Sequence, residues 1–320
     1  MNKALNNKIQ LSSLREIGIV IAFFIMLGIL AILSPTAFAK PANLINILKQ
    51  ASINGILAMG MMFVIISGGI DLSVGSIVAL SGVIAATFAH PGEYPLIVPI
   101  ALSVAVGALV GLANGSLVAY GNIPPFIVTL GSMTIVRGLA LITAGGQPVF
   151  NVTDAFKDLA GGKIFEIIPH LVIYYILVTA ICAFVLTWTV FGRRVYAIGG
   201  NEIAAKVSGI HVNSLKLAVY TISGILAGLA GLLLASRIIS GNPTAGQGYE
   251  LDAIAAVIIG GVSMTGGAGK WYGTFVGALF IAVIGNGLDI MNVSAHFQLI
   301  IKGAIIIIAV LLDIKGKSKQ

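Results

Sequence analysis

Polar side chains interrupt the long apolar runs of this 320-residue chain. A polar group among apolar residues is costly unless it hydrogen-bonds to a neighbour or to a solute. Most of these groups are neutral, which suits the hydroxyl groups of an uncharged solute better than a proton relay or a cation filter. We therefore predict a polar translocation path lined by Asn54, Asn114, Ser132, Thr134 and Asn286. For each residue alone, a hydrogen bond between two helices is the alternative.

Two cations also fall within apolar runs, Arg137 and Lys302. Long basic side chains can extend toward the edge of a membrane and keep their charge in water. They can instead pair with a carboxylate, and Asp71 and Asp289 are the candidates we consider.

The segment 192–214 has the most regular spacing in the chain. Its sequence predicts a turn at Gly199-Gly200 followed by a short helix, because Asn201 can cap a helix and Glu202 in the first turn suits the helix dipole. Small side chains would let the backbone of this helix approach the surface of a partner. We therefore predict a docking helix, rather than an ordinary loop, that uses Asn201, Glu202, Ala204, Ala205, Ser208 and Gly209.

The sequence lacks the common motifs of soluble enzymes. Lys270 follows a glycine but precedes Trp271, so no phosphate-binding loop is formed, and there is no Gly-x-Ser-x-Gly elbow. The histidines are scattered and do not predict a metal site. The single cysteine, Cys182, lies in an apolar run, where we expect it to be buried. We predict no catalytic residue, no metal ligand and no cofactor on this chain.

Composition points to the membrane. The chain is 58% hydrophobic and 9% charged, with a mean hydropathy of +1.05, whereas a soluble protein carries about 25% charged residues. The net charge of +7 is distributed mainly between apolar runs, so it does not predict nucleic-acid binding. The runs are too long for the strands of a β-barrel.

The apolar runs predict an all-α bundle of about ten membrane spans. The run at 251–265 is short enough to be broken or re-entrant, and only Ser67–Ile70 separates the second run from the third. The predicted spans are 17–34, 50–67, 71–89, 95–119, 123–143, 167–191, 215–238, 251–265, 272–290 and 295–313.

Basic residues predict the orientation, because they concentrate in cytoplasmic segments. With both termini in the cytoplasm, more basic residues lie inside than outside. The inside set is Lys3, Lys8, Arg15, Arg193, Arg194, Lys206, Lys216, Lys270, Lys315, Lys317 and Lys319, and the outside set is Lys40, Lys49, Lys157, Lys163 and Arg237. We predict a single domain, 1–320, whose cytoplasmic parts include 1–16, 192–214 and 314–320.

Glycines recur at four-residue spacing in three of the predicted spans. This spacing places small residues on one helix face and predicts close helix packing. The three sets are Gly107/Gly111/Gly115, Gly224/Gly228 and Gly273/Gly277.

Three stretches resemble the ribose-type sugar permeases of ABC transporters: Gly68–Ser76, Gly199–Ile210 and Pro243–Gly261. The resemblance implies the membrane subunit of an importer in the bacterial inner membrane, present as a homodimer in the lipid bilayer. It implies a cytoplasmic ATPase that binds ATP and Mg²⁺, and a periplasmic sugar-binding protein. The predicted docking helix corresponds to the segment that couples to the ATPase.

The resemblance also implies that the outer loop Asn242–Glu250 faces the binding protein, through Asn242, Thr244, Gln247 and Glu250. The glycines beside Asp71 suggest a broken helix near the solute path, so Asp71 joins the predicted path. Ribose is the first choice of substrate. The alternatives are xylose, galactose, arabinose, allose or a furanosyl signal such as autoinducer-2. An ion-coupled secondary transporter is the rival class, which the scarcity of buried carboxylates disfavours.

Overall fold

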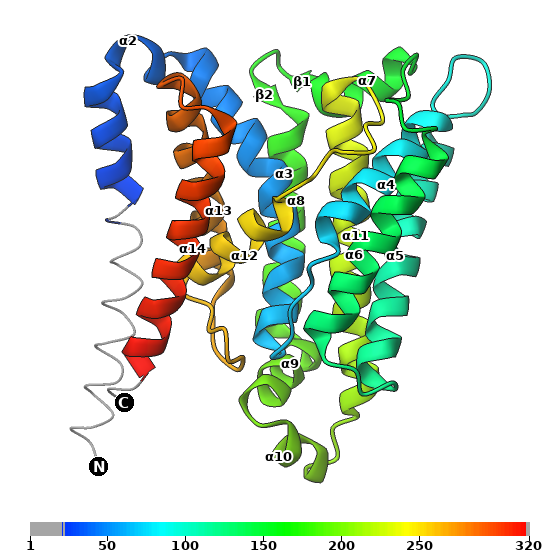
Figure 1. Ribbon diagram of the computed structural model, residues 1–320, viewed down its shortest axis with the longest axis vertical. Helices are drawn as coiled ribbons and strands as arrows, with labels where there is room; N and C mark the ends of the chain where they lie inside the picture. The colour runs from blue at the N-terminus through cyan, green and yellow to red at the C-terminus, as the bar shows by residue number, and fades with distance from the viewer. Residues whose placement is uncertain (1–20, 22, 318–320) are drawn as a thin grey trace.

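The computed structural model describes residues 21 and 23–317. The predicted cytoplasmic segment 1–16 lies outside the described residues, as do residues 318–320 of the predicted tail. The chain forms a bundle of helices that mostly run along one axis (Figure 1). The helices are α2 (Pro35–Phe38), α3 (Pro41–Ile66), α4 (Val74–Thr87), α5 (Ile97–Ala119), α6 (Pro125–Thr143), α7 (Asp154–Gly161), α8 (His170–Trp188), α9 (Val190–Gly200), α10 (Glu202–Val207), α11 (Val212–Ile238), α12 (Tyr249–Ile259), α13 (Trp271–Ile290) and α14 (Ala295–Lys317).

The all-helical prediction is confirmed, with one short addition. Strands β1 (Lys163–Ile164) and β2 (Ile168–Pro169) pair antiparallel in a small hairpin. Among the described residues, six helices are long and apolar enough to cross a membrane: α3, α5, α6, α8, α11 and α13. The apolar stretches Phe23–Leu33, Val74–Thr87 and Ala295–Leu311 are shorter. The chain is therefore a multi-pass membrane protein.

Helix α3 lies at the centre of the bundle. Every residue from Ala51 to Ile66 is buried, as expected for a helix that is apolar on all sides. Helices α5, α6 and α8 each leave most of their residues partly or fully exposed. Their exposed side chains are largely apolar, and so suit contact with lipid tails or with another membrane protein.

The three glycine sets lie where helices pack closely, as their spacing predicts. A Cβ atom added to Gly111 would meet the backbone of Tyr220 and Gly224, so α5 and α11 touch backbone to backbone. Gly107 meets Gly224 and Gly228 in the same way. Gly273 and Gly277 of α13 likewise face the backbone of α12. Close packing at these three glycine sets is confirmed.

Figure 1 places α7 and the β1–β2 hairpin at one end of the bundle and α9 and α10 at the other. We refer to these as the α7 end and the α10 end. The C-terminal end of α14 lies at the α10 end (Figure 1). Helix α7 is fixed to the bundle by Phe156, which is fully buried against α4 and α11 residues, and by Ser236, whose hydroxyl donates to the carbonyl of Phe156.

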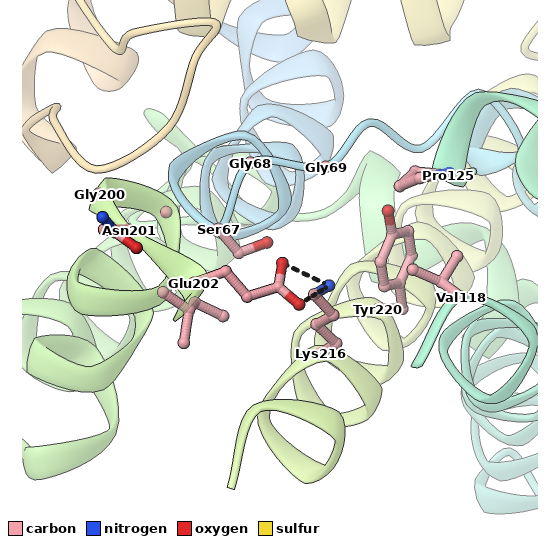
Figure 2. A pocket seen from close by; sticks show the side chains of 12 residues that line it. Ser67, Gly68, Gly69, Val118, Pro125, Gly200, Asn201, Glu202, Lys216 and Tyr220 are labelled. Atoms are coloured by element: carbon pink, nitrogen blue, oxygen red, sulfur yellow. Dashed lines mark hydrogen bonds and ion pairs between the residues drawn. The ribbon is translucent and has the colours of Figure 1, made fainter. Parts of the chain in front are cut away.

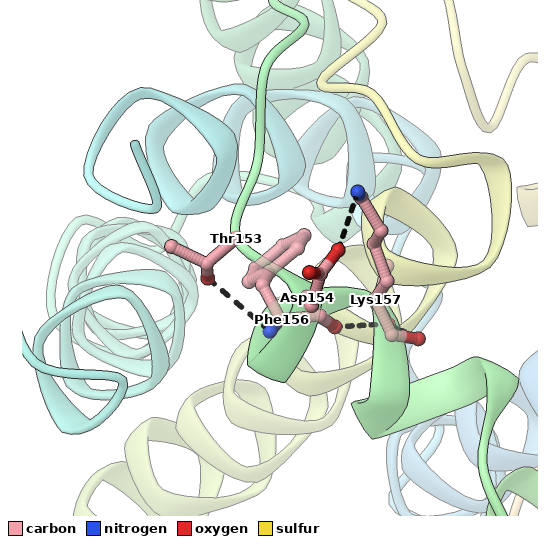
Figure 3. Close-up of polar contacts among 5 residues, drawn as sticks. Thr153, Asp154, Phe156 and Lys157 are labelled. Atoms are coloured by element: carbon pink, nitrogen blue, oxygen red, sulfur yellow. Dashed lines mark hydrogen bonds and ion pairs between the residues drawn. The ribbon is translucent and has the colours of Figure 1, made fainter. Parts of the chain in front are cut away.

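The start of α7 is stabilised locally (Figure 3). Thr153 accepts a hydrogen bond from the backbone N–H of Phe156, which caps the helix. Lys157 bonds to Asp154 at 2.8 Å, and this hydrogen bond and the positive charge hold the pKa of Asp154 below its ordinary value.

Two helices begin inside the bundle. Helix α3 ends at Ile66 and is followed by a Schellman motif, in which Ser67 is the C-cap, Gly68 has a φ of +85° and the N–H of Gly69 donates to the carbonyl of Val64. The chain then turns back toward the middle, where α4 begins (Figure 1). Helix α12 has only 11 residues, so the predicted span at 251–265 is a short helix followed by a glycine-rich loop.

Candidate functional site

The predicted docking helix exists as α10, but the segment before it differs from the prediction. Residues Val190–Gly200 are helical, so Gly199-Gly200 ends a helix instead of forming a turn between loop and helix. Asn201 then separates α9 from α10, and its Oδ1 accepts the N–H of Ala204 at 2.9 Å. The predicted cap is therefore confirmed. Gly209, with a φ of +82°, ends the segment.

Two apolar residues that were not among the predicted docking residues dominate the outer surface of α10. Ile203 is 78% exposed and Val207 is 84% exposed, and their four-residue spacing places them on one face. Ala205 on the opposite side is buried. A pair of apolar side chains four residues apart normally indicates a core face, so only the structure shows that this pair points outward.

Glu202 has a partner on another helix. Lys216 of α11 donates to both carboxylate oxygens of Glu202 at 2.8 Å (Figure 2). The pair borders a cavity of about 320 Å³ at the α10 end, whose other lining residues include Ser67, Gly68 and Tyr220. The α10 segment is thus linked to α11 by charge as well as by the chain.

A cluster of glycines joins α9 to the end of α3 and to the loop after α12. Gly199 packs directly on the carbonyl of Ile66, and Gly267 donates its N–H to that same carbonyl at 2.9 Å. Tyr196 of α9 donates to the carbonyl of Gly269 at 2.7 Å, and burial raises the pKa of this phenol. These contacts fix α9 to the helix ends above it. Gly266 packs against Gly199 in the same place. We call the contact formed by Ile66, Gly199, Gly266 and Gly267 the glycine junction.

The break between α3 and α4 holds a buried polar cluster. Asp71 is fully buried and accepts hydrogen bonds from the N–H and the hydroxyl of Ser73 and from the hydroxyl of Ser223 on α11. Asn114 of α5 donates to the Ser73 hydroxyl at 2.9 Å. The structure thus brings together two residues of the predicted path, Asp71 and Asn114, as one hydrogen-bonded group.

The other predicted path residues are dispersed. Asn54 is buried on α3. Asn286 exchanges two amide hydrogen bonds with Asn43, at 2.8 and 2.9 Å, which joins α13 to the start of α3. Ser132 is half-buried on α6, and Thr134 is exposed on the same helix. For Asn286, the alternative of a hydrogen bond between helices is the one observed.

The carboxylate partners suggested for the two cations were wrong. Lys302 bonds to Asp252 at 2.8 Å, joining α14 to α12. Arg137 donates to the backbone carbonyls of Pro243, Ala245 and Gly75. Asp252 lies 50 positions from Lys302 in the sequence, so local spacing gave no sign of the pair.

The spans also bury more carboxylate than the sequence suggested, because Asp71 and Asp252 are both buried. Each has hydrogen-bonding partners, so neither is left as an isolated charge. Cys182 is buried as predicted. In the part of the chain that the structure describes, no group of three His, Cys, Asp or Glu side chains could hold a metal ion.

The predicted contact residues for a binding protein fall into two groups. Asn242 and Thr244 lie near the α7 end, where Asn242 accepts hydrogen bonds from Thr244 and the adjacent Gly241 forms a bridge with Val149. The chain then passes to α12, between the two ends (Figure 1). There Gln247 and Glu250 line a cavity of about 420 Å³ together with Thr134.

The sequence of this chain is similar to those of known transport permeases. The family model described as branched-chain amino acid transport system, permease component, matches residues 43–310. The ribose import permease of Bacillus subtilis is 45% identical over 94% of this chain and 94% of its own length. The ribose import permease of Escherichia coli K12 is 43% identical over 92% of each chain, and its galactose/methyl galactoside import permease is 40% identical over 97% of each. No solved structure matches the chain. The matches confirm the resemblance drawn from the motifs, and the chain belongs to this family of transport permeases, among the ribose-type sugar ABC permeases.

Proposed function

We propose that the chain is the membrane subunit of an ATP-driven importer that carries a monosaccharide, with ribose as the first choice. The observation that carries this proposal is the likeness to ribose import permeases along almost the whole of both chains. Galactose, allose, xylose, arabinose and a furanosyl signal such as autoinducer-2 are the other candidate solutes, since one relative imports galactose and methyl galactoside.

The importer is proposed to be a homodimer of this chain in the bacterial inner membrane. The six long helices, the three shorter apolar helices and α12 would make ten crossings. Both termini would be cytoplasmic together with α10, because basic residues concentrate at that side and α14 ends there. A periplasmic binding protein would deliver the sugar at the α7 end, where Asn242 and Thr244 are the proposed contacts.

A cytoplasmic ATPase, which would bind ATP and Mg²⁺, is proposed to receive α10. Ile203 and Val207 supply the apolar surface that such a groove would cover, and the capped turn at Asn201 and the bend at Gly209 hold the helix in place. Movement of α10 would reach the bundle through α9 and the glycine junction, and through Lys216 to α11. The permease then converts motion of its partner into alternating access.

The test is ribose uptake by cells that lack their own ribose permease and express this chain with the ATPase and binding protein encoded beside it. We expect uptake that requires the ATPase. Unlabelled ribose should compete better than galactose, allose or xylose if ribose is the substrate. Uptake that persists without the ATPase and stops when the proton gradient is removed would support the ion-coupled rival.

Variants of α10 test the coupling. Ile203→Asp and Val207→Asp should abolish uptake and capture of the ATPase while the permease remains folded in the membrane. Phe165→Asp is the matched control for capture of the ATPase, because Phe165 is 87% exposed at the opposite, α7 end. Bulky replacements of Glu202 or Gly209 should also abolish uptake. Normal uptake and normal ATPase capture in the α10 variants would contradict the assignment.

A further inference from the structure

A cavity lined by both polar and apolar groups opens between α6 and the segment that leads into α12. Its volume is about 420 Å³, within the range of about 300–1,000 Å³ typical of small-molecule sites. Four polar side chains line it, Thr134, Arg137, Gln247 and Glu250, and Met133 and Leu141 add apolar surface. A hydroxylated ring needs this combination, since its edges hydrogen-bond and its faces do not.

Two charged side chains of the cavity lie at membrane depth, where a charge costs free energy unless it is paired or hydrated. Arg137 lies in the middle of a helix long and apolar enough to span the membrane, and Glu250 reaches the same cavity from the first turn of α12. Charged groups at membrane depth face a protein interior or a water-filled space, not lipid. A cavity open at the surface of one chain is therefore expected to face water or a second copy.

The cavity is also built rigidly. Arg137 bonds to the carbonyls of Pro243 and Ala245 at 2.8 and 2.7 Å and to that of Gly75 at 3.3 Å, which accounts for three of its N–H groups. Glu250 lies against Gly75, where an added Cβ atom would collide with its carboxylate. Thus the two glycine-rich motifs, at Gly68–Ser76 and Pro243–Gly261, pack on each other and hold the charged side chains in place.

Three side chains in the cavity can still form hydrogen bonds with a ligand. Glu250 accepts one hydrogen bond, from the backbone N–H of Gly248, and a carboxylate can accept several. Gln247 and Thr134 are both exposed, and the Thr134 hydroxyl donates only to Gly131 of its own helix, so its oxygen can still accept. At the α10 end, by contrast, the two charged side chains that line the cavity are bonded to each other, Glu202 to Lys216.

We propose that this cavity is the sugar-contact site of the translocation path, in which Thr134, Gln247 and Glu250 bind sugar hydroxyls and Arg137 positions the wall that holds them. The inference rests on the proposed function and makes it specific, because it moves Gln247 and Glu250 from the outer docking surface to the path itself. The solute class is a neutral polyhydroxylated ring. Asn242 and Thr244 remain at the docking surface.

The experiment uses the permease reconstituted in lipid vesicles with its ATPase and binding protein. Maximal ribose uptake and ATP hydrolysis stimulated by the loaded binding protein are measured side by side. Gln247→Ala and Thr134→Val should each slow uptake roughly fivefold, as for the loss of one hydrogen bond. Glu250→Gln removes the negative charge of the acceptor and should slow uptake roughly tenfold. Stimulated ATP hydrolysis should be retained. Ile135→Ala, at an exposed position of α6 outside the cavity lining, should transport normally.

The possible outcomes distinguish failure of the proposed function from failure of the site assignment. If the unmodified complex transports no sugar, the proposed function fails and this site with it. If the unmodified complex transports ribose and the three cavity variants match Ile135→Ala, the site assignment alone is overturned. It is also overturned if uptake and stimulated ATP hydrolysis fall together in folded variants, because the cavity then serves coupling and not sugar contact.

Discussion

At the scale of single residues, Asp71 shows how a charged group is accommodated deep in this bundle. Its carboxylate accepts hydrogen bonds from Ser73, beside it in the α3–α4 break, and from Ser223 of α11, which is distant in the sequence and meets them only through the fold. Asn114 extends the group to a third helix. The cluster therefore joins the α3–α4 break to α5 and α11, and the carboxylate is the acceptor that Ser73 and Ser223 share.

Replacing Asp71 tests this dependence. In Asp71→Leu the hydroxyls of Ser73 and Ser223 lose their acceptor, at a cost of roughly 1–3 kcal/mol for each unsatisfied group. Asp71→Asn keeps the shape and one acceptor oxygen and should lose less. The measurement is the midpoint of thermal unfolding in detergent. Asp154→Asn, which breaks only an exposed ion pair, should shift the midpoint far less than Asp71→Leu. An Asp71→Leu protein as stable as the parent would contradict the role of the cluster.

Lys302 and Asp252 offer a second prediction at this scale. Lys302→Met should destabilise the protein by roughly 3–5 kcal/mol, because it leaves a buried carboxylate without its cation. Adding Asp252→Asn should recover part of the loss. A double-mutant cycle on unfolding free energies in mixed micelles measures the coupling, and strictly additive losses would show that the pair contributes nothing.

At the scale of elements, contact between backbones determines which helices stay together. Gly111 of α5 lies against the backbone of α11, so a larger residue would force the two helices apart. Gly131 of α6 has open space around it and provides a matched control. Gly111→Leu should abolish recovery of folded protein and Gly131→Leu should not. Recovery is followed by size-exclusion chromatography of the detergent-solubilised protein; equal recovery of both would refute the packing argument.

The elements also show what a sequence can predict here. The glycine spacing and the Asn201 cap were predicted correctly because each depends on neighbours within one or two turns. The extent of α9, the partner of Lys302 and the outward direction of Ile203 and Val207 were not, because they depend on contacts between distant segments. The cavity combines Thr134 with Gln247 and Glu250, residues that the sequence had assigned to separate roles.

At the scale of the whole molecule, the two ends of the bundle should face opposite sides of the membrane. Asp154→Cys on α7 and Ser208→Cys after α10 would report each side, since both positions are exposed and the native Cys182 is buried. A membrane-impermeant thiol reagent should label Asp154→Cys in cells whose outer membrane alone is opened. Labelling of Ser208→Cys should require disruption of the inner membrane. Equal labelling of both would contradict the orientation.

The two helices that begin inside the bundle have a further consequence for the kind of solute that can pass. The start of an α-helix carries a partial positive charge. Here each interior start has a carboxylate beside it, Asp71 at α4 and Glu250 at α12. The local fields at these two helix starts therefore largely cancel. Arg137 is already bonded to three backbone carbonyls, so an anion such as a phosphorylated sugar would find little attraction there to offset the loss of its hydration. The interior favours solutes that arrive uncharged.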